Sequence, residues 1–125
     1  MTDLPNNLKY SENHVWAKKE GEYLILGLTK PFVDKSKEFA FVELPNQGDK
    51  AQKGEEFCTV ESVKSSAHIN SPVDGEVIEV NEEVLDEPPM LNEAPYENWL
   101  IKVKPEAGND EMLDADSYAE TLRGE

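Results

Sequence analysis

The feature that most constrains the fold is a pair of short strand-like runs, residues 56–63 and 66–70, which meet at Val63-Lys64. Apolar and polar residues alternate in both runs, as is typical of strands that bury one face. The short connection between them predicts a β-hairpin with Lys64 at its tip. A lysine at an exposed tip can be reached by a modifying enzyme and can then swing.

Turn signals recur at close spacing along the rest of the chain. They separate further strands, which we expect at residues 14–18, 23–28, 39–44, 75–80 and 99–103. Short helices are expected at residues 31–37, 110–113 and 116–122, and Thr29 is suited to cap the first of them. Residues 81–92 contain two adjacent prolines and predict a loop with at most one helical turn. Many short strands predict a mainly β fold of the sandwich or barrel type.

The bulk composition limits the classes of partner. The length of 125 residues suits one domain with one core, spanning residues 1–125. The formal net charge is −15, from 27 acidic against 12 basic side chains. That field repels nucleic acid and anionic membranes, so we expect neither as a partner. It would suit a partner with a basic docking face, and it equally fits adaptation to a salty cytoplasm.

Cysteine usage and the first residues predict a cytoplasmic protein. Cys58 is the only cysteine, so no internal disulfide can form, which fits a reducing compartment. Residues 1–7 have neither the basic nor the apolar region of a signal peptide, and no apolar run is long enough to span a bilayer. A small chain of this charge is most simply a monomer.

The sequence contains no pattern that indicates a catalytic centre or a metal site. Its two histidines, His14 and His68, lie far apart, and no spacing typical of metal ligands occurs. No glycine-rich loop precedes a helix, and no histidine–acid relay accompanies the serines near Lys64. We therefore expect a protein that is not an enzyme. Cys58 lies two residues before Val60 and so on the same face of the strand, which favours a buried core residue. The alternative is an exposed thiol that can react with a disulfide on the carried group.

Taken together, eleven phrases of the sequence resemble the H-protein family of the glycine cleavage system, over residues 8–118. They are Leu8-Lys9-Tyr10, His14-x-Trp16, Leu26-Gly27-Leu28-Thr29, Phe41-Val42-Glu43-Leu44-Pro45, Gly48-Asp49, Lys53-Gly54-Glu55, Val60-Glu61-Ser62-Val63-Lys64, Ser71-Pro72-Val73-x-Gly75-Glu76-Val77, Glu79-Val80-Asn81, Leu91-Asn92-x-x-Pro95-Tyr96 and Trp99-Leu100. The resemblance is highly specific because it rests on all of these phrases together and not on any single one. The resemblance implies a barrel-sandwich hybrid, the lipoyl-domain-like fold, with short peripheral and C-terminal helices.

The resemblance also implies a carrier with lipoate attached covalently to Lys64. Glu61 looks like the nearby acid by which a lipoate ligase or lipoyl transferase recognises the target loop. We expect the cofactor's surroundings to include Glu61, Ser62, Val63, Val15 and His68, with His14 as a candidate lining residue. An amine on a flexible stem suits this role, since the attached group can visit several active sites in turn.

The sequence departs from the family at positions that bear on the carried group. Val15 stands where the family typically has a glutamate, His68 where it has an aspartate, and Cys58 where it usually has a glycine. Nearby carboxylates would stabilise a cationic aminomethyl group on the arm, and both candidate acids are absent. This favours a paralogue like the lipoate-binding proteins of bacterial sulfur oxidation, which carry sulfur for a heterodisulfide-reductase-like complex. The alternative is an H-protein of the glycine cleavage system, which carries the aminomethyl group from glycine decarboxylase to aminomethyltransferase.

Two further interpretations of Lys64 remain. A biotin carrier would usually present Met-Lys-Met at the tip, whereas this tip is Val63-Lys64-Ser65, so the sequence disfavours biotin. Lys64 can also be an ordinary surface lysine at a turn, in which case the chain is a small β-sandwich interaction module without a cofactor.

Overall fold

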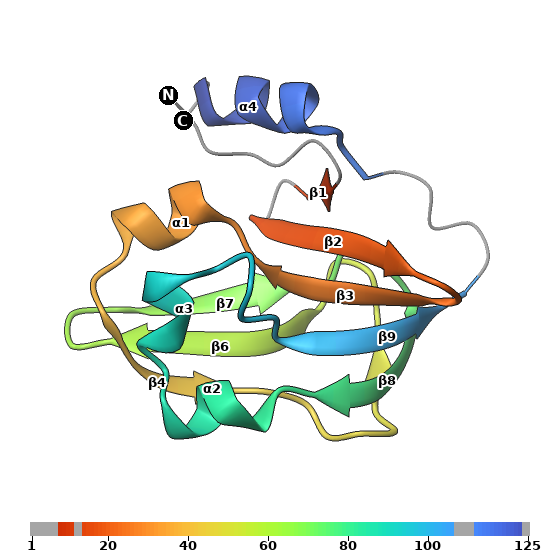
Figure 1. Cartoon of the computed structure of the whole chain (residues 1–125), viewed down its shortest axis with the longest axis horizontal. Helices are drawn as coiled ribbons and strands as arrows, with labels where there is room; N and C mark the ends of the chain where they lie inside the picture. Colours follow the sequence, from red (N-terminus) through yellow and green to blue (C-terminus); the bar gives the residue numbers. More distant parts are fainter. Residues whose placement is uncertain (1–7, 12–13, 107–111, 124–125) are drawn as a thin grey trace.

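A computed structural model of the protein, which describes residues 8–11, 14–106 and 112–123, contains two β-sheets with short helices around them (Figure 1). The strands are β1 (Lys9–Tyr10), β2 (Val15–Glu20), β3 (Tyr23–Leu28), β4 (Phe39–Glu43), β5 (Lys50–Ala51), β6 (Glu56–Ser62), β7 (Ser66–Asn70), β8 (Gly75–Val80) and β9 (Ile101–Pro105). The helices are α1 (Lys30–Lys35), α2 (Glu82–Asp86), α3 (Met90–Glu93) and α4 (Ala115–Arg123).

The larger sheet has six strands in the order β1-β2-β3-β9-β8-β5, and the smaller has three in the order β4-β6-β7. Neighbouring strands are antiparallel in both sheets. Neither sheet closes on itself, and short helices surround the sheets (Figure 1). This architecture confirms the predicted mainly β, barrel-sandwich fold with short peripheral helices.

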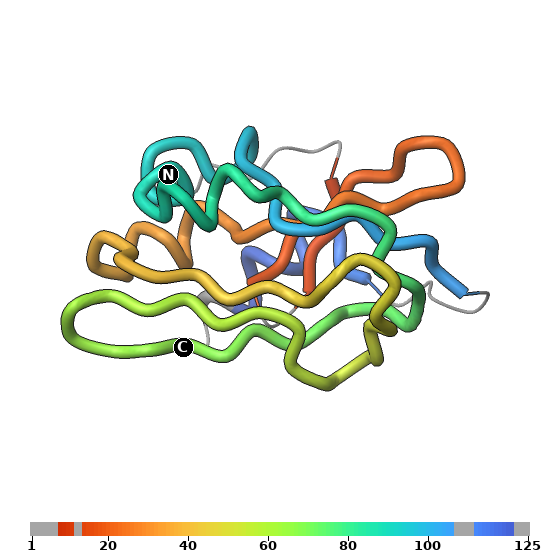
Figure 2. The backbone as a smooth tube through the Cα atoms, turned by 90° about the horizontal axis from the view of Figure 1, so that it is seen from below, coloured from red at the N-terminus to blue at the C-terminus, as the bar shows by residue number. Residues whose placement is uncertain are grey.

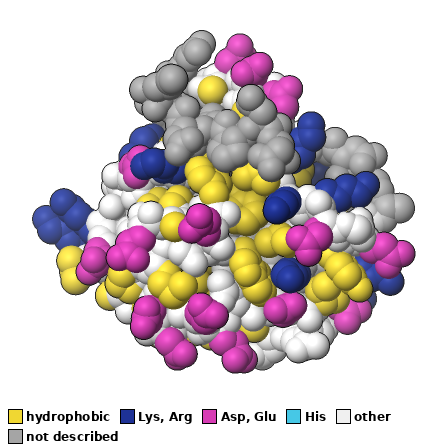
Figure 3. Space-filling view, viewed as in Figure 1, with side chains coloured by type: hydrophobic (Ala, Val, Ile, Leu, Met, Phe, Trp, Pro, Cys, Tyr) yellow, Lys and Arg dark blue, Asp and Glu magenta, His cyan; other side chains and the backbone are white. Residues whose placement is uncertain are grey.

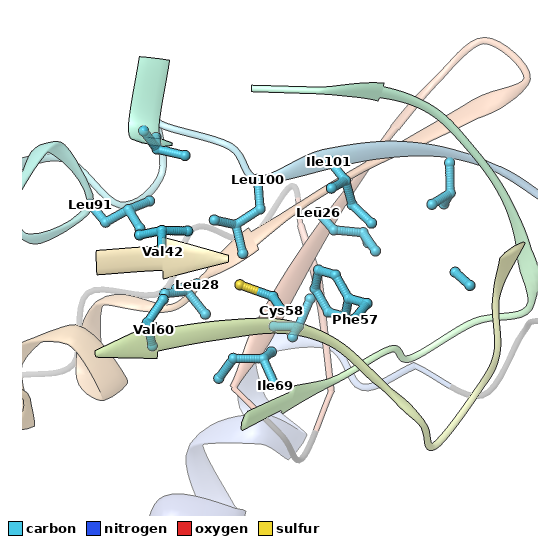
Figure 4. Packing of buried hydrophobic residues seen from close by; sticks show 14 of the residues in the cluster. Leu26, Leu28, Val42, Phe57, Cys58, Val60, Ile69, Leu91, Leu100 and Ile101 are labelled. Atoms are coloured by element: carbon cyan, nitrogen blue, oxygen red, sulfur yellow. The ribbon is translucent and has the colours of Figure 1, made fainter. Parts of the chain in front are cut away.

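Apolar side chains from the two sheets meet in one principal core. Leu28 of β3 and Val60 of β6 point toward one another in Figure 4, and both are buried in the same cluster. Alternate residues of β6, Cys58 and Val60, face this core. Each large aliphatic side chain buried here stabilises the fold by about 1.5–3 kcal/mol relative to exposure. The core therefore fixes which face of the β6–β7 hairpin is turned to solvent.

Helix α1 confirms the helix expected at residues 31–37, although it begins one residue earlier and ends two residues earlier, and Thr29 does not cap it as predicted. Thr29 occupies the N-cap position, yet its side chain makes no capping hydrogen bond. Its hydroxyl lies instead 2.8 Å from the hydroxyl of Tyr118, in α4. Pro31 lies in the first turn, as expected for a residue without a backbone N–H.

The prediction of a loop over residues 81–92 with at most one helical turn is wrong, because this segment contains α2 and most of α3. Asn81 caps α2 by accepting a hydrogen bond from the Glu83 backbone N–H at 3.2 Å. Val84 of α2 and Leu91 of α3 are fully buried in the principal core. Tertiary packing of these two side chains stabilises helices that are too short to be stable alone.

Strands β3, β7 and β8 have the predicted bounds, and the other predicted strands differ from them by one or two residues at one or both ends. Strand β2 begins at Val15, because His14 has a positive φ of 69° that no strand residue adopts. Strands β1 and β5 were not predicted, since two residues are too few to show alternation.

The C-terminal region bears out one of two predicted helices. Helix α4 confirms the one expected at residues 116–122, and Asp114 caps it by accepting a hydrogen bond from the Ser117 backbone N–H at 2.8 Å. This bond holds the pKa of the Asp114 carboxyl below its usual range. The prediction of a helix at residues 110–113 is wrong for Leu113, because this residue pairs with Tyr10 in a β-bridge. Residues 110–111 lie outside the part of the chain that the structure describes.

A second, mostly aromatic cluster lies on the outer side of the larger sheet. Trp16 of β2 lies directly across from Gly27 of β3, and its indole N–H donates to the carbonyl of Pro95 at 3.0 Å. A Cβ atom on Gly27 would lie 2.5 Å from the Trp16 ring. The indole can therefore lie over the strand only because residue 27 has no side chain.

Acidic side chains are spread over the molecular surface. In Figure 3 they are dense along the lower edge, where Figure 1 places α2. Within the described ranges, no helix is long and apolar enough to cross a membrane. Among the same residues there is also no group of three or more histidine, cysteine or acidic side chains that could hold a metal ion.

We expect Gly27→Ala to destabilise the protein by about 1–3 kcal/mol, because the new methyl group must displace the Trp16 ring. Urea unfolding followed by tryptophan fluorescence measures this. Lys18→Ala, an exposed change on β2, is the control and should alter the free energy of unfolding by no more than about 0.5 kcal/mol. Equal stability of the Gly27→Ala and wild-type proteins would contradict this packing.

Candidate functional site

The β6–β7 hairpin ends in the turn Ser62-Val63-Lys64-Ser65, which carries Lys64 as predicted. The Ser62 backbone N–H donates to the Ser65 carbonyl at 2.9 Å and closes the turn. The Ser62 hydroxyl oxygen lies 3.4 Å from the backbone nitrogens of Lys64 and Ser65. A serine in this position stabilises a turn by offering its oxygen to the backbone. Ser62 thus holds the loop that bears the lysine.

Val63 and Lys64 both project into solvent at this tip. Val63 keeps 85% of its surface accessible, and Lys64 is exposed. In the part of the chain that the structure describes, no ion pair or side-chain hydrogen bond holds the Lys64 ammonium. The hairpin loop extends to one end of the molecule in both views of the backbone (Figure 1, Figure 2). The lysine is therefore accessible to another protein.

Glu61 lies one residue pair from the tip, on the outer face of the three-stranded sheet. Because Cys58 and Val60 face the core, Glu61 faces solvent. The register places Glu61 between Phe41 of β4 and Ser66 of β7, and all three residues are exposed. We call these three residues, Phe41, Glu61 and Ser66, the tip row.

His68 lies on the same outer face, one row further from the tip. Its strand partner is Thr59, and its Nδ1 atom lies 2.7 Å from Oε2 of Glu56 and 3.2 Å from the Thr59 hydroxyl. Glu56 begins β6, at the end of the hairpin away from Lys64. These contacts do not support a role for His68 in replacing an acid beside the arm, and its predicted place near the arm stays a prediction.

His14 and Val15 come from the other sheet, at the start of β2. Val15 is fully buried in the principal core. His14 is half-buried: its ring stacks on that of Phe32 in α1 with centroids 5.5 Å apart, and its Nδ1 atom lies 2.6 Å from the Tyr118 hydroxyl. The structure thus gives both residues packing roles, and a place for either one beside the arm stays a prediction.

Phe41 is an exposed residue beside the candidate site that the sequence pattern does not reveal. Phe39 and Phe41 are two residues apart, so regular alternation would place them on one face. A β-bulge between them shifts the register, so Phe39 is 3% exposed and Phe41 is 49% exposed. The bulge arises from pairing with β6, which no local pattern of β4 encodes.

Cys58 is a core residue, as its strand parity predicts. Its side chain is 2% exposed and lies between the two sheets (Figure 4). Burial, aided by the charges of Glu56 and Glu43, raises the pKa of the Cys58 thiol far above its usual range. A buried, protonated thiol is inert, so the alternative of a thiol that meets a carried disulfide has no support here.

We expect Tyr118→Phe to lower the free energy of unfolding by about 1–3 kcal/mol, because the buried Thr29 hydroxyl loses its partner and His14 loses one of its own. Chemical denaturation measures the difference. Tyr23→Phe, at an exposed strand end, is the matched control and should leave stability nearly unchanged. An unfolding midpoint for Tyr118→Phe equal to that of the wild type would show that the hydrogen bonds of this hydroxyl do not stabilise the fold.

The raised pKa of Cys58 predicts a pH dependence of stability. The thiol's contribution is fully present below the ordinary thiol value of about 9 and is lost as pH rises towards the folded-state pKa, because only the unfolded chain releases the proton. The stability difference between the wild type and Cys58→Ala should therefore shrink by up to about 1.4 kcal/mol per pH unit above that value. Urea unfolding of both proteins at pH 7 to 10 tests this, and a constant difference would refute it.

Comparisons with known proteins agree on one family. The family model described as "Glycine cleavage H-protein" matches residues 8–125. The glycine cleavage system H protein of Halalkalibacterium halodurans is 44% identical over 128 aligned positions, which cover 100% of both chains. That of Carboxydothermus hydrogenoformans is 43% identical, with 100% of this chain and 98% of the relative covered.

A solved structure extends the agreement to the backbone. The crystal structure of a glycine cleavage system H protein from Mycobacterium marinum superposes with a TM-score of 0.88 at 29% identity, covering 98% of this chain and 100% of the other. The chain therefore belongs to the glycine cleavage H-protein family, whose members are non-catalytic carriers of a lipoate attached covalently to a lysine.

Proposed function

We propose that this protein carries lipoate on Lys64 in the glycine cleavage system, and that it conveys the aminomethyl group from glycine decarboxylase to aminomethyltransferase. The observation that carries the proposal is the position of Lys64, exposed at the tip of a hairpin that Cys58, Val60 and Ile69 anchor in the core. The named relatives are all H proteins of that system, which supports this cargo over others.

The residues at the tip fit an attached lipoyl group. Acylation removes the charge of the lysine and lengthens its side chain, and neither change breaks a contact because no described residue holds the Lys64 ammonium. When bound, lipoate supplies a disulfide that can be reduced and can carry a group on sulfur. The sheet beneath the tip stays rigid while the arm moves.

The chain's own residues present and identify the attachment point. Ser62 holds the turn through its backbone and hydroxyl contacts. Glu61 is an exposed carboxylate three residues before the lysine, where a lipoate ligase or lipoyl transferase can read it. With a net charge of −15, the protein would attract a partner enzyme that has a basic docking face.

The sulfur-carrying role favoured by the sequence finds no support in the comparisons, and neither does a heterodisulfide-reductase-like partner. Val15 and His68 occupy the two positions at which the resemblance implies family acids. Because Val15 is a core residue, its replacement of a glutamate changes packing as well as charge. The single-domain organisation, the monomeric state and the cytoplasmic location stay predictions.

We expect Lys64→Arg to abolish lipoylation, because the guanidinium keeps the charge and length of the side chain but is not acylated. Intact mass spectrometry after incubation with a lipoate ligase, lipoate and ATP measures the added lipoyl mass. Lys19→Arg, an exposed change on β2, is the matched control and should gain that mass in full. A lipoyl mass on Lys64→Arg would assign the cofactor to another lysine.

The cargo can be read from protein purified from its host without reductant. Peptide mapping should find the lipoyl group on the peptide that contains Lys64, together with an aminomethyl adduct when glycine is supplied. Additional sulfur on that peptide would overturn the proposed cargo in favour of sulfur transfer. An unmodified Lys64 would contradict the carrier role itself.

A further inference from the structure

The tip row and Val63 form a surface with features that neither folding nor the carried group explains. We propose that Phe41, Val63 and Glu61 together are the docking surface for the enzyme that attaches lipoate to Lys64. That enzyme would present an apolar pocket with a basic group beside it. The inference rests on the proposed function, which it deepens by naming a partner surface on a second strand.

Val63 departs from what a turn normally contains. It occupies the second position of the turn Ser62-Val63-Lys64-Ser65, where small polar residues, proline and glycine are usual. A β-branched side chain gains nothing there from packing, because 85% of its surface faces water. Departures from local preference of this kind are expected at functional sites.

Phe41 shows the same departure on the neighbouring strand. The bulge between Phe39 and Phe41 turns the second ring away from the core, to an exposure of 49%. It lies directly across from Glu61, which is one residue pair inside the tip. Figure 2 shows β4 alongside β6, and the register places Phe41 beside Glu61, within one residue pair of the turn that carries Lys64. Aromatic side chains, Phe among them, are enriched in protein–protein interfaces relative to the rest of the surface.

The position of this surface favours the attaching enzyme over later partners. In the attachment step the Lys64 nitrogen bonds to the carbonyl carbon of an activated lipoyl donor such as lipoyl adenylate. The bond to the donor's leaving group breaks with its electron pair, and the amine releases a proton. The donor's carbonyl must therefore reach the lysine's own nitrogen, which brings the surface of the enzyme to the tip beside Val63. Partners that act on the loaded arm meet its far end and need not cover the tip.

The charge of the surface fits the same partner. Glu61 lies in the tip row, and Glu43 faces outward one row further along β4. His68 is engaged with Glu56 at the other end of the hairpin. Glu61 and Glu43 therefore place two carboxylates on the face around Phe41, which would complement a basic rim on the enzyme and speed their encounter.

Two substitutions test the docking surface. Phe41→Thr keeps a strand-forming residue, and Val63→Ser places a turn-forming residue at a site that makes little contact with the fold. We expect each to lower kcat/KM for lipoate attachment about tenfold, with the rate followed by intact mass under a lipoate ligase, lipoate and ATP. Tyr23→Thr is the matched control, since Tyr23 is a strand aromatic that is 41% exposed and is the first residue of β3, which starts at the opposite end of the molecule from the β6–β7 loop (Figure 1). It should be lipoylated at the wild-type rate.

The outcomes separate this inference from the function on which it rests. If the wild-type protein gains no lipoyl mass, the proposed function fails. If the wild type is lipoylated and both variants match it, the docking surface is refuted. Normal attachment to the variants with slow turnover once they are loaded would assign the surface to the glycine cleavage enzymes instead. A change of oligomeric state on Phe41→Thr, seen by light scattering, would assign it to a second copy of this chain. Both of these last results overturn the proposal.

Discussion

The packing of β6 and β7 into the core is the constraint on which the rest of the site depends. Cys58 and Val60 of β6, with Ile69 of β7, are buried between the sheets. Their burial fixes the register and the outward face of the hairpin, because a slip of one residue would exchange its two faces. Glu61 and Ser66 are exposed for that reason. A rigid base of this kind allows the four tip residues to carry a mobile group without loosening the fold.

The larger sheet and its helices provide the other half of this framework. Two short helices, α2 and α3, contribute Val84 and Leu91 to the principal core. The Tyr118 hydroxyl joins α4 to the segments before α1 and β2, through Thr29 and His14. His14 therefore has a structural role, and its predicted place in the cofactor's surroundings stays a prediction. A polar side chain in a conspicuous motif can owe its presence to such a hydrogen bond within the fold.

The predictability of each feature follows the range of the interactions behind it. The β6–β7 hairpin and the exposure of Lys64 depend on alternation within a few residues, so the sequence predicts them. The two-residue strands β1 and β5 and the helices of residues 81–92 depend on partners distant in the chain, and local patterns miss them. The preference for a sulfur cargo rested on two replaced acids, and one of these, Val15, has a packing role that only the core explains.

The sequence by itself determined the fold class, the place of Lys64 at a tip and the burial of Cys58, because each follows from local periodicity and turn chemistry. Only the tertiary structure decided what surrounds that lysine. It turned Phe41 outward through a bulge, drew His68 to Glu56 and engaged His14 with Tyr118. These arrangements depend on strand register and on contacts between residues as many as 104 positions apart, which no local window of sequence contains.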